Sequence, residues 1–330
     1  MAEPSPGSAG LVGLEPQPGI PKPDPILVVD HVRRSFGGLI AVDVDPLELQ
    51  RGAITSLIGP NGAGKTTFFN LMTGFDVADT GAGTFDGHNL RNVAAHQVAR
   101  LGMVRTFQLT KALTRLSVLE NMKLGATEQR GERLLASLWA PLWRSQEQEI
   151  EARAEELLER FNLAHMRDEL AGTLSGGQRK LLEMARALMV QPSMVMLDEP
   201  MAGVNPALTQ SLLEHVKELP HLGMSVLFVE HDMDVVMDIS DWVVVMAQGR
   251  IIAEGPPDAI ANNQDVIDAY LGADHGDESR FTPTTLTGPT AEASAAAAAG
   301  GRAGGTGTIT PPRPGKARDQ HPGTDAEDLT

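Results

Sequence analysis

The residues with the clearest chemical meaning lie at Gly59–Thr67, where the chain could bind a polyphosphate. They read GPNGAGKTT and fit the pattern G-x-x-x-x-G-K-S/T. The glycines allow a tight turn that brings backbone N–H groups against phosphate oxygens. Lys65 is predicted to place its charge at the β- and γ-phosphates, and Thr66 to offer a hydroxyl to Mg²⁺. An apolar stretch before this loop and a helical stretch after it favour a phosphate site over a glycine-rich loop with a chance lysine.

A second feature is the run Met194–Glu199, in which four apolar residues lead into two carboxylates. The apolar residues predict a buried parallel strand. Ligand sites in parallel sheets lie at the carboxyl ends of the strands. Asp198 is therefore predicted to hold Mg²⁺ through water, and Glu199 to polarise the water that attacks the γ-phosphate. An acidic strand end without a function is the alternative, and the upstream phosphate loop argues against it.

The stretch Leu174–Gln178 reads LSGGQ and opens a segment with helical spacing of apolar residues. Ser175 is a natural N-cap. Its hydroxyl, the glycine N–H groups and the helix dipole together predict a second anion site. A capped helix without a ligand is the alternative, and the wider context LSGGQRKLLEMARAL disfavours it.

These motifs, in this order, resemble those of ATP-binding cassette (ABC) proteins, in which ATP is closed between two subunits. The resemblance covers roughly residues 25–272 and implies an α/β fold. Its expected parts are a P-loop NTPase (RecA-like) parallel-sheet core, an antiparallel β-subdomain and an inserted α-helical subdomain. It also implies that the LSGGQ stretch completes the ATP site of the partner subunit rather than its own.

The same resemblance assigns four further residues. His231 follows the apolar stretch Ser225–Glu230 and is expected to contact the γ-phosphate, although a lone histidine at a strand end is often only solvated. Gln108 is expected to reach Mg²⁺ and to sense the transmembrane subunit. Phe36 is expected to stack on adenine, with a plain core residue as the alternative. Asn205 stands where the family most often has an aspartate, which puts charge-based cross-talk between the two ATP sites in doubt.

The expected cofactors are ATP and Mg²⁺. The predicted catalytic residues are Glu199 and His231, and the predicted metal ligands are Thr66, Gln108 and Asp198. The predicted nucleotide contacts are Phe36, Gly59, Pro60, Asn61, Gly62, Ala63, Gly64, Lys65, Thr66, Thr67, Gln108, Ser175, Gly176, Gly177 and Gln178.

Three further phrases resemble the ATP-binding subunits of branched-chain (hydrophobic) amino acid importers: FGGLIAVDVDPLEL, VRTFQLTKALTRLSVLENM and DVIDAYLG. Related subunits for urea or lipopolysaccharide transport share much of the core and remain alternatives. The implied partners are transmembrane permease subunits, a second ABC ATPase in a homodimer or heterodimer, and indirectly a substrate-binding protein. The implied location is peripheral, on the cytoplasmic side of the cell membrane.

The composition agrees with such a subunit. The chain has 330 residues and no cysteine, which excludes disulfides and thiolate metal sites and fits a reducing compartment. The longest apolar runs, such as Trp242–Ala247, are far shorter than the roughly 20 residues that cross a bilayer. No signal peptide is visible. A net charge of −16 argues against nucleic acid as a partner and against an anionic-lipid anchor.

Three regions are predicted along the chain. Residues 1–24 are rich in proline and glycine and are expected to be disordered, as is the Ala/Gly/Thr/Pro-rich tail 273–330. Residues 25–272 alternate short apolar strands with helical patterns. Within them, residues from about 109 to 171 are expected to form the helical subdomain. The apolar face of one of its helices is predicted to comprise Ile150, Ala154, Leu157, Leu158 and Phe161.

A non-transport ABC ATPase, active in chromosome maintenance, DNA repair or translation, is the less favoured alternative. Only 110 positions separate Lys65 from Ser175, too few for the long coiled coil of chromosome-maintenance ATPases, and the single P-loop disfavours a two-cassette translation factor. The presence of Lys65, Glu199 and His231 argues against a regulatory cassette that does not hydrolyse ATP.

An apolar patch in the helical insert, interrupted by Pro141, is a hypothetical docking surface for the transmembrane subunit or the partner ATPase, and packing onto its own subdomain is the alternative. The patch consists of Leu134, Leu135, Leu138, Trp139, Leu142 and Trp143.

Overall fold

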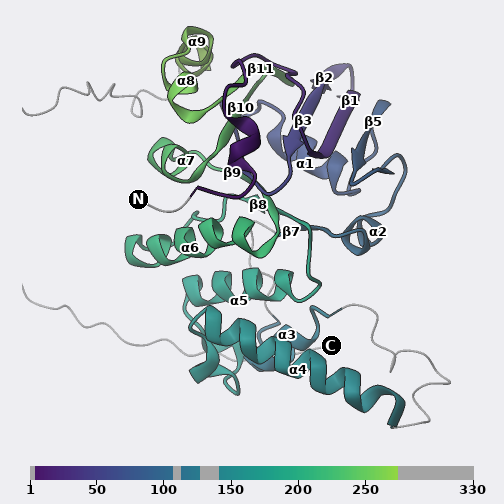
Figure 1. Ribbon diagram of the computed structural model, residues 1–330, viewed down its shortest axis with the longest axis vertical. Coiled ribbons are helices and arrows are strands. Elements are labelled where there is room, and N and C mark those ends of the chain that lie inside the picture. Colours follow the sequence, from purple (N-terminus) through teal and green to yellow (C-terminus); the bar gives the residue numbers. More distant parts are fainter. Residues whose placement is uncertain (1–3, 107–112, 127–140, 274–330) are drawn as a thin grey trace, which may run out of the picture. The chain divides into compact units, whose positions relative to one another are not determined.

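The central element is a six-stranded sheet in the order β11-β10-β4-β9-β8-β7 (Figure 1). The structure is a computed structural model that describes residues 4–106, 113–126 and 141–273. Strands β10, β4, β9, β8 and β7 run parallel, and β11 is antiparallel to β10. The strands are β4 (Ile54–Ile58), β7 (Met103–Arg105), β8 (Met194–Asp198), β9 (Ser225–Val229), β10 (Trp242–Ala247) and β11 (Arg250–Gly255).

A second, antiparallel sheet has the order β2-β1-β5-β6, with β3 also paired to β1. Its strands are β1 (Pro25–Phe36), β2 (Leu39–Val44), β3 (Leu47–Gln50), β5 (Thr80–Phe85) and β6 (His88–Asn89). The predicted combination of a parallel core and an antiparallel β-subdomain is confirmed.

The parallel strands are buried on both faces, and their side chains alternate between two apolar cores. On β8, Val195 and Leu197 enter one core, whereas Met194 and Met196 enter the other. Strand β9 divides its residues in the same way. This period of two explains why these strands appear in the sequence as continuous apolar runs.

Helices cover the cores and supply the expected helical subdomain, where α5 packs against α3 and α4 (Figure 1). The apolar face predicted for α4 is buried at all positions except Ile150, which is partly buried against the same core. The helices are α1 (Lys65–Met72), α2 (Ala95–Arg100), α3 (Val118–Lys123), α4 (Pro141–Arg160), α5 (Gly176–Leu188), α6 (Pro206–Glu218), α7 (Met233–Ile239), α8 (Pro257–Ala261) and α9 (Gln264–Ala273).

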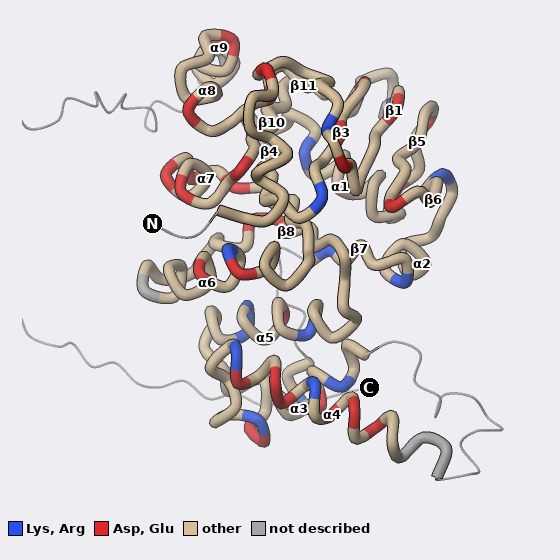
Figure 2. Tube along the Cα trace, viewed as in Figure 1, with Lys and Arg blue, Asp and Glu red and all other residues tan. Residues whose placement is uncertain are grey.

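Acidic residues recur along α4, and Figure 2 shows them beside basic residues of the neighbouring segments. Lys123 of α3 pairs with Glu151 at 3.2 Å, and Arg167 pairs with Glu151 and Glu155. These partly exposed pairs each contribute little stability, but as a network they hold α3 and the segment after α4 in register.

The prediction that residues 1–24 are disordered is wrong for residues 4–24. Residues Ser8–Leu11 form the 3₁₀-helix η1, and Leu11 is buried in the core. Lys22 forms a fully buried ion pair with Glu254 at 3.3 Å and lies 4.7 Å above the ring of Trp242. The composition misled because this segment is ordered by partners outside it, some nearby, such as Gly52 and Glu48, and others more than 200 residues along the chain, such as Glu254.

Some predictions fall outside the described residues. These are the placement of Gln108, the apolar docking patch that includes Trp139 and the side chain of Trp143, and the tail beyond Ala273. In the part of the chain that the structure describes, none of the helices combines the length and apolar character needed to cross a membrane.

Candidate nucleotide-binding site

The loop between β4 and α1 is shaped by three glycines with positive φ. A Cβ atom at Gly59 (φ 148°) would lie 1.9 Å from the carbonyl oxygen of Met246, and one at Gly64 (φ 104°) would lie 2.3 Å from that of Ala41. Any side chain at these two positions would collide with backbone. Gly62 (φ 78°) instead has no atom within 4 Å of where its Cβ would be, so the loop has open space on that side.

Lys65 begins α1 and is almost fully buried, with 7% of its surface exposed. Its ammonium donates to the carbonyl oxygens of Gly59 at 2.5 Å and Pro60 at 3.1 Å. Burial lowers the pKa of Lys65, and the nearby Glu199 and Asp198 carboxylates partly offset this shift. Phosphate oxygens could take the place of the two carbonyls, and a buried cation attracts them more strongly than an exposed one.

Asp198 ends β8 and forms a buried ion pair that the sequence did not reveal. Its carboxylate lies 2.6 Å from Nη2 of Arg105, and the two side chains are 7% and 8% exposed. Nη1 of Arg105 donates to Oδ1 of Asn70 on α1 at 2.6 Å, so one guanidinium joins β7, β8 and the phosphate-loop helix. Thr66 lies exposed in the first turn of α1.

Glu199 and His231 meet at 2.7 Å, between Oε1 and Nε2. The ends of β8 and β9 are adjacent in register, with Asp198 opposite Val229, which brings the residues that follow each strand together. Glu199 has φ +47°, and its N–H donates to the Val229 carbonyl at 3.0 Å. Such a conformation costs about 1–3 kcal/mol in a residue other than glycine and is typical of functional sites. The two side chains are 23% and 43% exposed, so water can reach both.

Phe36 ends β1 with 49% of its surface exposed, which excludes the alternative that it is a core residue. The guanidinium of Arg34 lies 4.7 Å from the ring centroid and is itself held by Asp76 and Asp79. The ring is therefore accessible for stacking, as predicted for an adenine platform.

The LSGGQ stretch forms a capped helix start. Ser175 and Gln178 make a capping box, in which the Gln178 N–H donates to the Ser175 hydroxyl at 3.3 Å and the Ser175 N–H to Oε1 of Gln178 at 2.9 Å. Gly176 faces open space, whereas a Cβ at Gly177 would lie 1.5 Å from a methyl group of Leu208 on α6. Among the described residues, no hydrogen bond or ion pair joins this stretch to the phosphate loop of the same chain.

Asn205 caps α6 in the same region. Its Oδ1 accepts from the Leu208 N–H at 2.9 Å, so the asparagine caps the helix without carrying a charge. Leu208 also packs on Gly177, so the starts of α5 and α6 are in contact.

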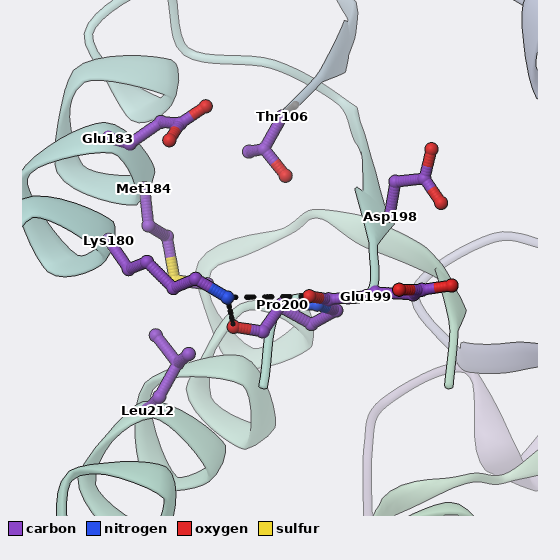
Figure 3. A pocket seen from close by; sticks show the side chains of 8 residues that line it. All are labelled: Thr106, Lys180, Glu183, Met184, Asp198, Glu199, Pro200 and Leu212. Carbon is purple, nitrogen blue, oxygen red and sulfur yellow. Dashed lines mark hydrogen bonds between the residues drawn. The ribbon is translucent and has the colours of Figure 1, made fainter. Parts of the chain in front are cut away.

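A hollow between α5, α6 and the ends of β7 and β8 lies beside the Glu199 turn (Figure 3). Lys180 extends from α5 to the backbone of this turn, where it donates to the Pro200 carbonyl at 2.8 Å. Neither Lys180 nor Arg105 is predictable from the sequence, because a single basic residue in a helix or strand has no signal until its buried partner is known. The hollow is lined by Thr106, Lys180, Glu183, Met184, Asp198, Glu199, Pro200 and Leu212.

Comparisons with known proteins show the family to which this chain belongs. The family described as "ABC transporter" matches residues 43–202, and that described as "Branched-chain amino acid ATP-binding cassette transporter" matches residues 250–276. The "probable branched-chain amino acid transport ATP-binding protein LivG" of Archaeoglobus fulgidus is 45% identical over 75% of this chain and 96% of its own length. The "high-affinity branched-chain amino acid transport ATP-binding protein BraF" of Pseudomonas aeruginosa is 42% identical. The match covers 75% of this chain and 98% of that protein.

Solved structures give the same result. A nucleotide-free ATP-binding cassette from an ABC transporter matches with a TM-score of 0.65 and 38% identity, over 74% of this chain and 98% of that one. The ADP conformation of an ABC transporter cassette matches with a TM-score of 0.64 and 37% identity. The match covers 75% of this chain and 99% of that one.

A phosphate loop on a parallel sheet, two carboxylates at the next strand end and a capped Gly-Gly helix define a P-loop ATPase of the cassette type. The chain belongs to the ABC transporter family, in the group of branched-chain amino acid transport ATP-binding proteins. Its activity is ATP hydrolysis coupled to transport.

Proposed function

We propose that this chain is the ATP-hydrolysing subunit of an importer for branched-chain amino acids. The observation that carries the proposal is the pair Glu199–His231 at 2.7 Å, adjacent to the buried Lys65 and Asp198. The names of the relatives and the match at residues 250–276 support branched-chain amino acids over urea or lipopolysaccharide.

Binding of ATP uses residues from two subunits. The N–H groups of the loop 59–67 and the Lys65 ammonium hold the phosphates, and Phe36 stacks on the base. Ser175, Gly176 and Gly177 of a second subunit close the site from the other side. This arrangement explains why the LSGGQ stretch of this chain makes no contact with its own loop in the described structure.

The residues at the site fit a magnesium ion. Hard oxygen ligands suit Mg²⁺, and they are present as the Thr66 hydroxyl and the Asp198 carboxylate, with Gln108 as a further proposed ligand. The Asp198 carboxylate is buried and already carries a cationic partner in Arg105, which indicates that the site stabilises positive charge. When bound, Mg²⁺ would neutralise charge that develops on the phosphates during transfer.

Hydrolysis depends on the two residues at the strand ends. Glu199 orients the attacking water and accepts its proton as the water oxygen bonds to the γ-phosphorus and the bond to the ADP oxygen breaks. The His231 imidazole holds the Glu199 carboxylate and contacts the γ-phosphate. Lys65 remains on the β- and γ-phosphates and stabilises the ADP that leaves.

ATP binding and hydrolysis drive a conformational change in the transmembrane permeases. Closure of two ATP sites draws two cassettes together, and the segment around Gln108 passes this motion to transmembrane permeases. We place the subunit on the cytoplasmic side of the membrane, bound there through the permeases, which in turn receive substrate from a binding protein.

The test is recovery of the complex. The tagged chain is purified from detergent-solubilised membranes of its native cells, and co-purifying proteins are identified by mass spectrometry. Two multi-span permeases and a second cassette are expected, together with ATPase activity stimulated by a branched-chain amino acid and its binding protein. Stimulation by urea only, or recovery of ribosomal or DNA-bound proteins without permeases, would overturn the proposal.

A further inference from the structure

Lys180 connects the LSGGQ helix to the backbone of the catalytic turn. Its ammonium donates to the carbonyl oxygens of Pro200 at 2.8 Å and Ala202 at 2.5 Å, and lies 3.5 Å from that of Glu199. An ammonium has three N–H donors, and here three carbonyls of one turn surround it. Figure 3 shows the side chain reaching from α5 across the hollow to this turn.

The same turn is also held by Glu230, which follows β9. The Oε1 atom of this buried carboxylate accepts from the Met201 N–H at 2.9 Å, and its Oε2 accepts from the His231 N–H at 3.3 Å. Residues 199–202 are therefore connected both to α5, through Lys180, and to the end of β9, through Glu230. A shift of α5 must either move this turn or break the Lys180 contacts.

The start of α5 is also coupled to the start of α6. Gly177 packs against Leu208, and Asn205 caps α6 immediately after the turn. A ligand that binds Ser175 and Gly176 therefore acts next to the Gly177–Leu208 contact, which connects α5 to the helix capped by Asn205. Lys180 adds a direct connection to the beginning of the 199–205 segment, next to Glu199.

We infer that Lys180 is a positioning residue through which docking of ATP on the LSGGQ stretch of one subunit sets the catalytic turn of the same subunit. This inference rests on the proposed function, since ATP on the LSGGQ stretch belongs to the partner's phosphate loop. The ATP in one site then controls the geometry of Glu199 and His231 in the other site. Lys180 thereby links the two sites through hydrogen bonds from its ammonium to backbone carbonyls, without a charge at Asn205.

The test compares three variants. Lys180→Met removes the ammonium and keeps the length of the side chain, and Lys180→Arg keeps a cationic donor. Lys217→Met is the matched control, because it removes the same group from α6 and breaks only an exposed pair with Asp238. Each variant is assayed for ATP affinity in EDTA with a fluorescent ATP analogue, for steady-state hydrolysis, and for its Hill coefficient toward MgATP.

Lys180→Met is expected to keep its ATP affinity within about twofold and to lose about 10- to 100-fold in kcat, as expected when a catalytic group is misplaced. Its Hill coefficient should fall from well above 1 to about 1, because the coupling between sites is lost. Lys180→Arg should retain the cooperativity, and Lys217→Met should behave as the wild type. In the unmodified protein, hydrogen exchange should show that MgATP protects the amides of residues 201–205.

Three results would overturn the inference: an unchanged Hill coefficient in Lys180→Met, a loss of ATP affinity equal to the loss of turnover, or no MgATP-dependent protection of residues 201–205. The Glu199→Gln variant separates this failure from failure of the proposed function. If that variant forms an ATP-dependent dimer while Lys180→Met behaves as the wild type, only the role of Lys180 is wrong. If no dimer forms, the two-subunit ATP site itself is wrong.

Discussion

Replacement of Arg105 by methionine should destabilise the protein by an amount that depends on magnesium. Arg105 and Asp198 form a pair at 2.6 Å with side chains 8% and 7% exposed. Removing one partner of a buried pair typically costs about 3–5 kcal/mol, because the remaining charge is left uncompensated. Arg250 and Asp43 form an exposed pair at 3.0 Å, with side chains 68% and 27% exposed. Arg250→Met should therefore lower the free energy of unfolding by at most about 1 kcal/mol.

The assay is equilibrium unfolding in urea, in EDTA and again with saturating Mg²⁺ and ADP. In EDTA, Arg105→Met should lose about 3 kcal/mol or more of the free energy of unfolding. With Mg²⁺ and ADP the deficit should shrink, because a bound cation then compensates Asp198. The double variant Arg105→Met/Asp198→Asn should be more stable than the sum of the single variants predicts. A deficit below about 1 kcal/mol in EDTA, or one that Mg²⁺ leaves unchanged, would refute this reasoning.

Three further predictions concern the site and its surroundings. His231→Ala breaks the 2.7 Å contact with Glu199 and should reduce kcat about 100-fold while ATP affinity in EDTA is retained, whereas equal losses in both would make His231 a binding residue. Gly64→Ala should destabilise the fold by roughly 2 kcal/mol more than Gly62→Ala in thermal unfolding, because only the former places a Cβ 2.3 Å from a backbone oxygen. Burial raises the pKa of Tyr270, the only tyrosine in the chain, to about 12, partly offset by the Gly59 N–H. The folded state thus keeps a proton that the unfolded state releases near pH 10, so this residue lowers stability as the pH rises from 10 to 12. Tyrosinate absorbance at 295 nm should show a midpoint near 12 in the folded protein and near 10 in urea, and a folded midpoint near 10 would contradict the burial of Tyr270.

Most of the core and several site positions could be predicted from sequence because their signals are local. A glycine-rich loop with Lys65 and an apolar strand that ends in Asp198 and Glu199 fix their own geometry within a few residues. The cap at Ser175 and the buried face of α4 follow from helical spacing and capping in the same way.

The remaining contacts could not be predicted because they depend on residues distant in the chain. Lys22 occurs in a Pro/Gly-rich segment that looks disordered until Glu254 and Trp242 are placed beside it. Arg105 and Lys180 resemble ordinary surface cations in sequence. Only the packing of β7 on β8, and of α5 beside the Glu199 turn, shows what they bind.

The most direct test of the central claim is the Glu199→Gln variant, which keeps the shape of the side chain and removes its ability to accept a proton. ATP binding should persist, turnover should fall by about 10²- to 10⁴-fold, and size-exclusion chromatography with MgATP should show a dimer. Asp268→Asn, a similar loss of charge on the exposed face of α9, should leave all three properties unchanged. Hydrolysis at the wild-type rate by Glu199→Gln would contradict the role given to Glu199, and with it the account of how this site works.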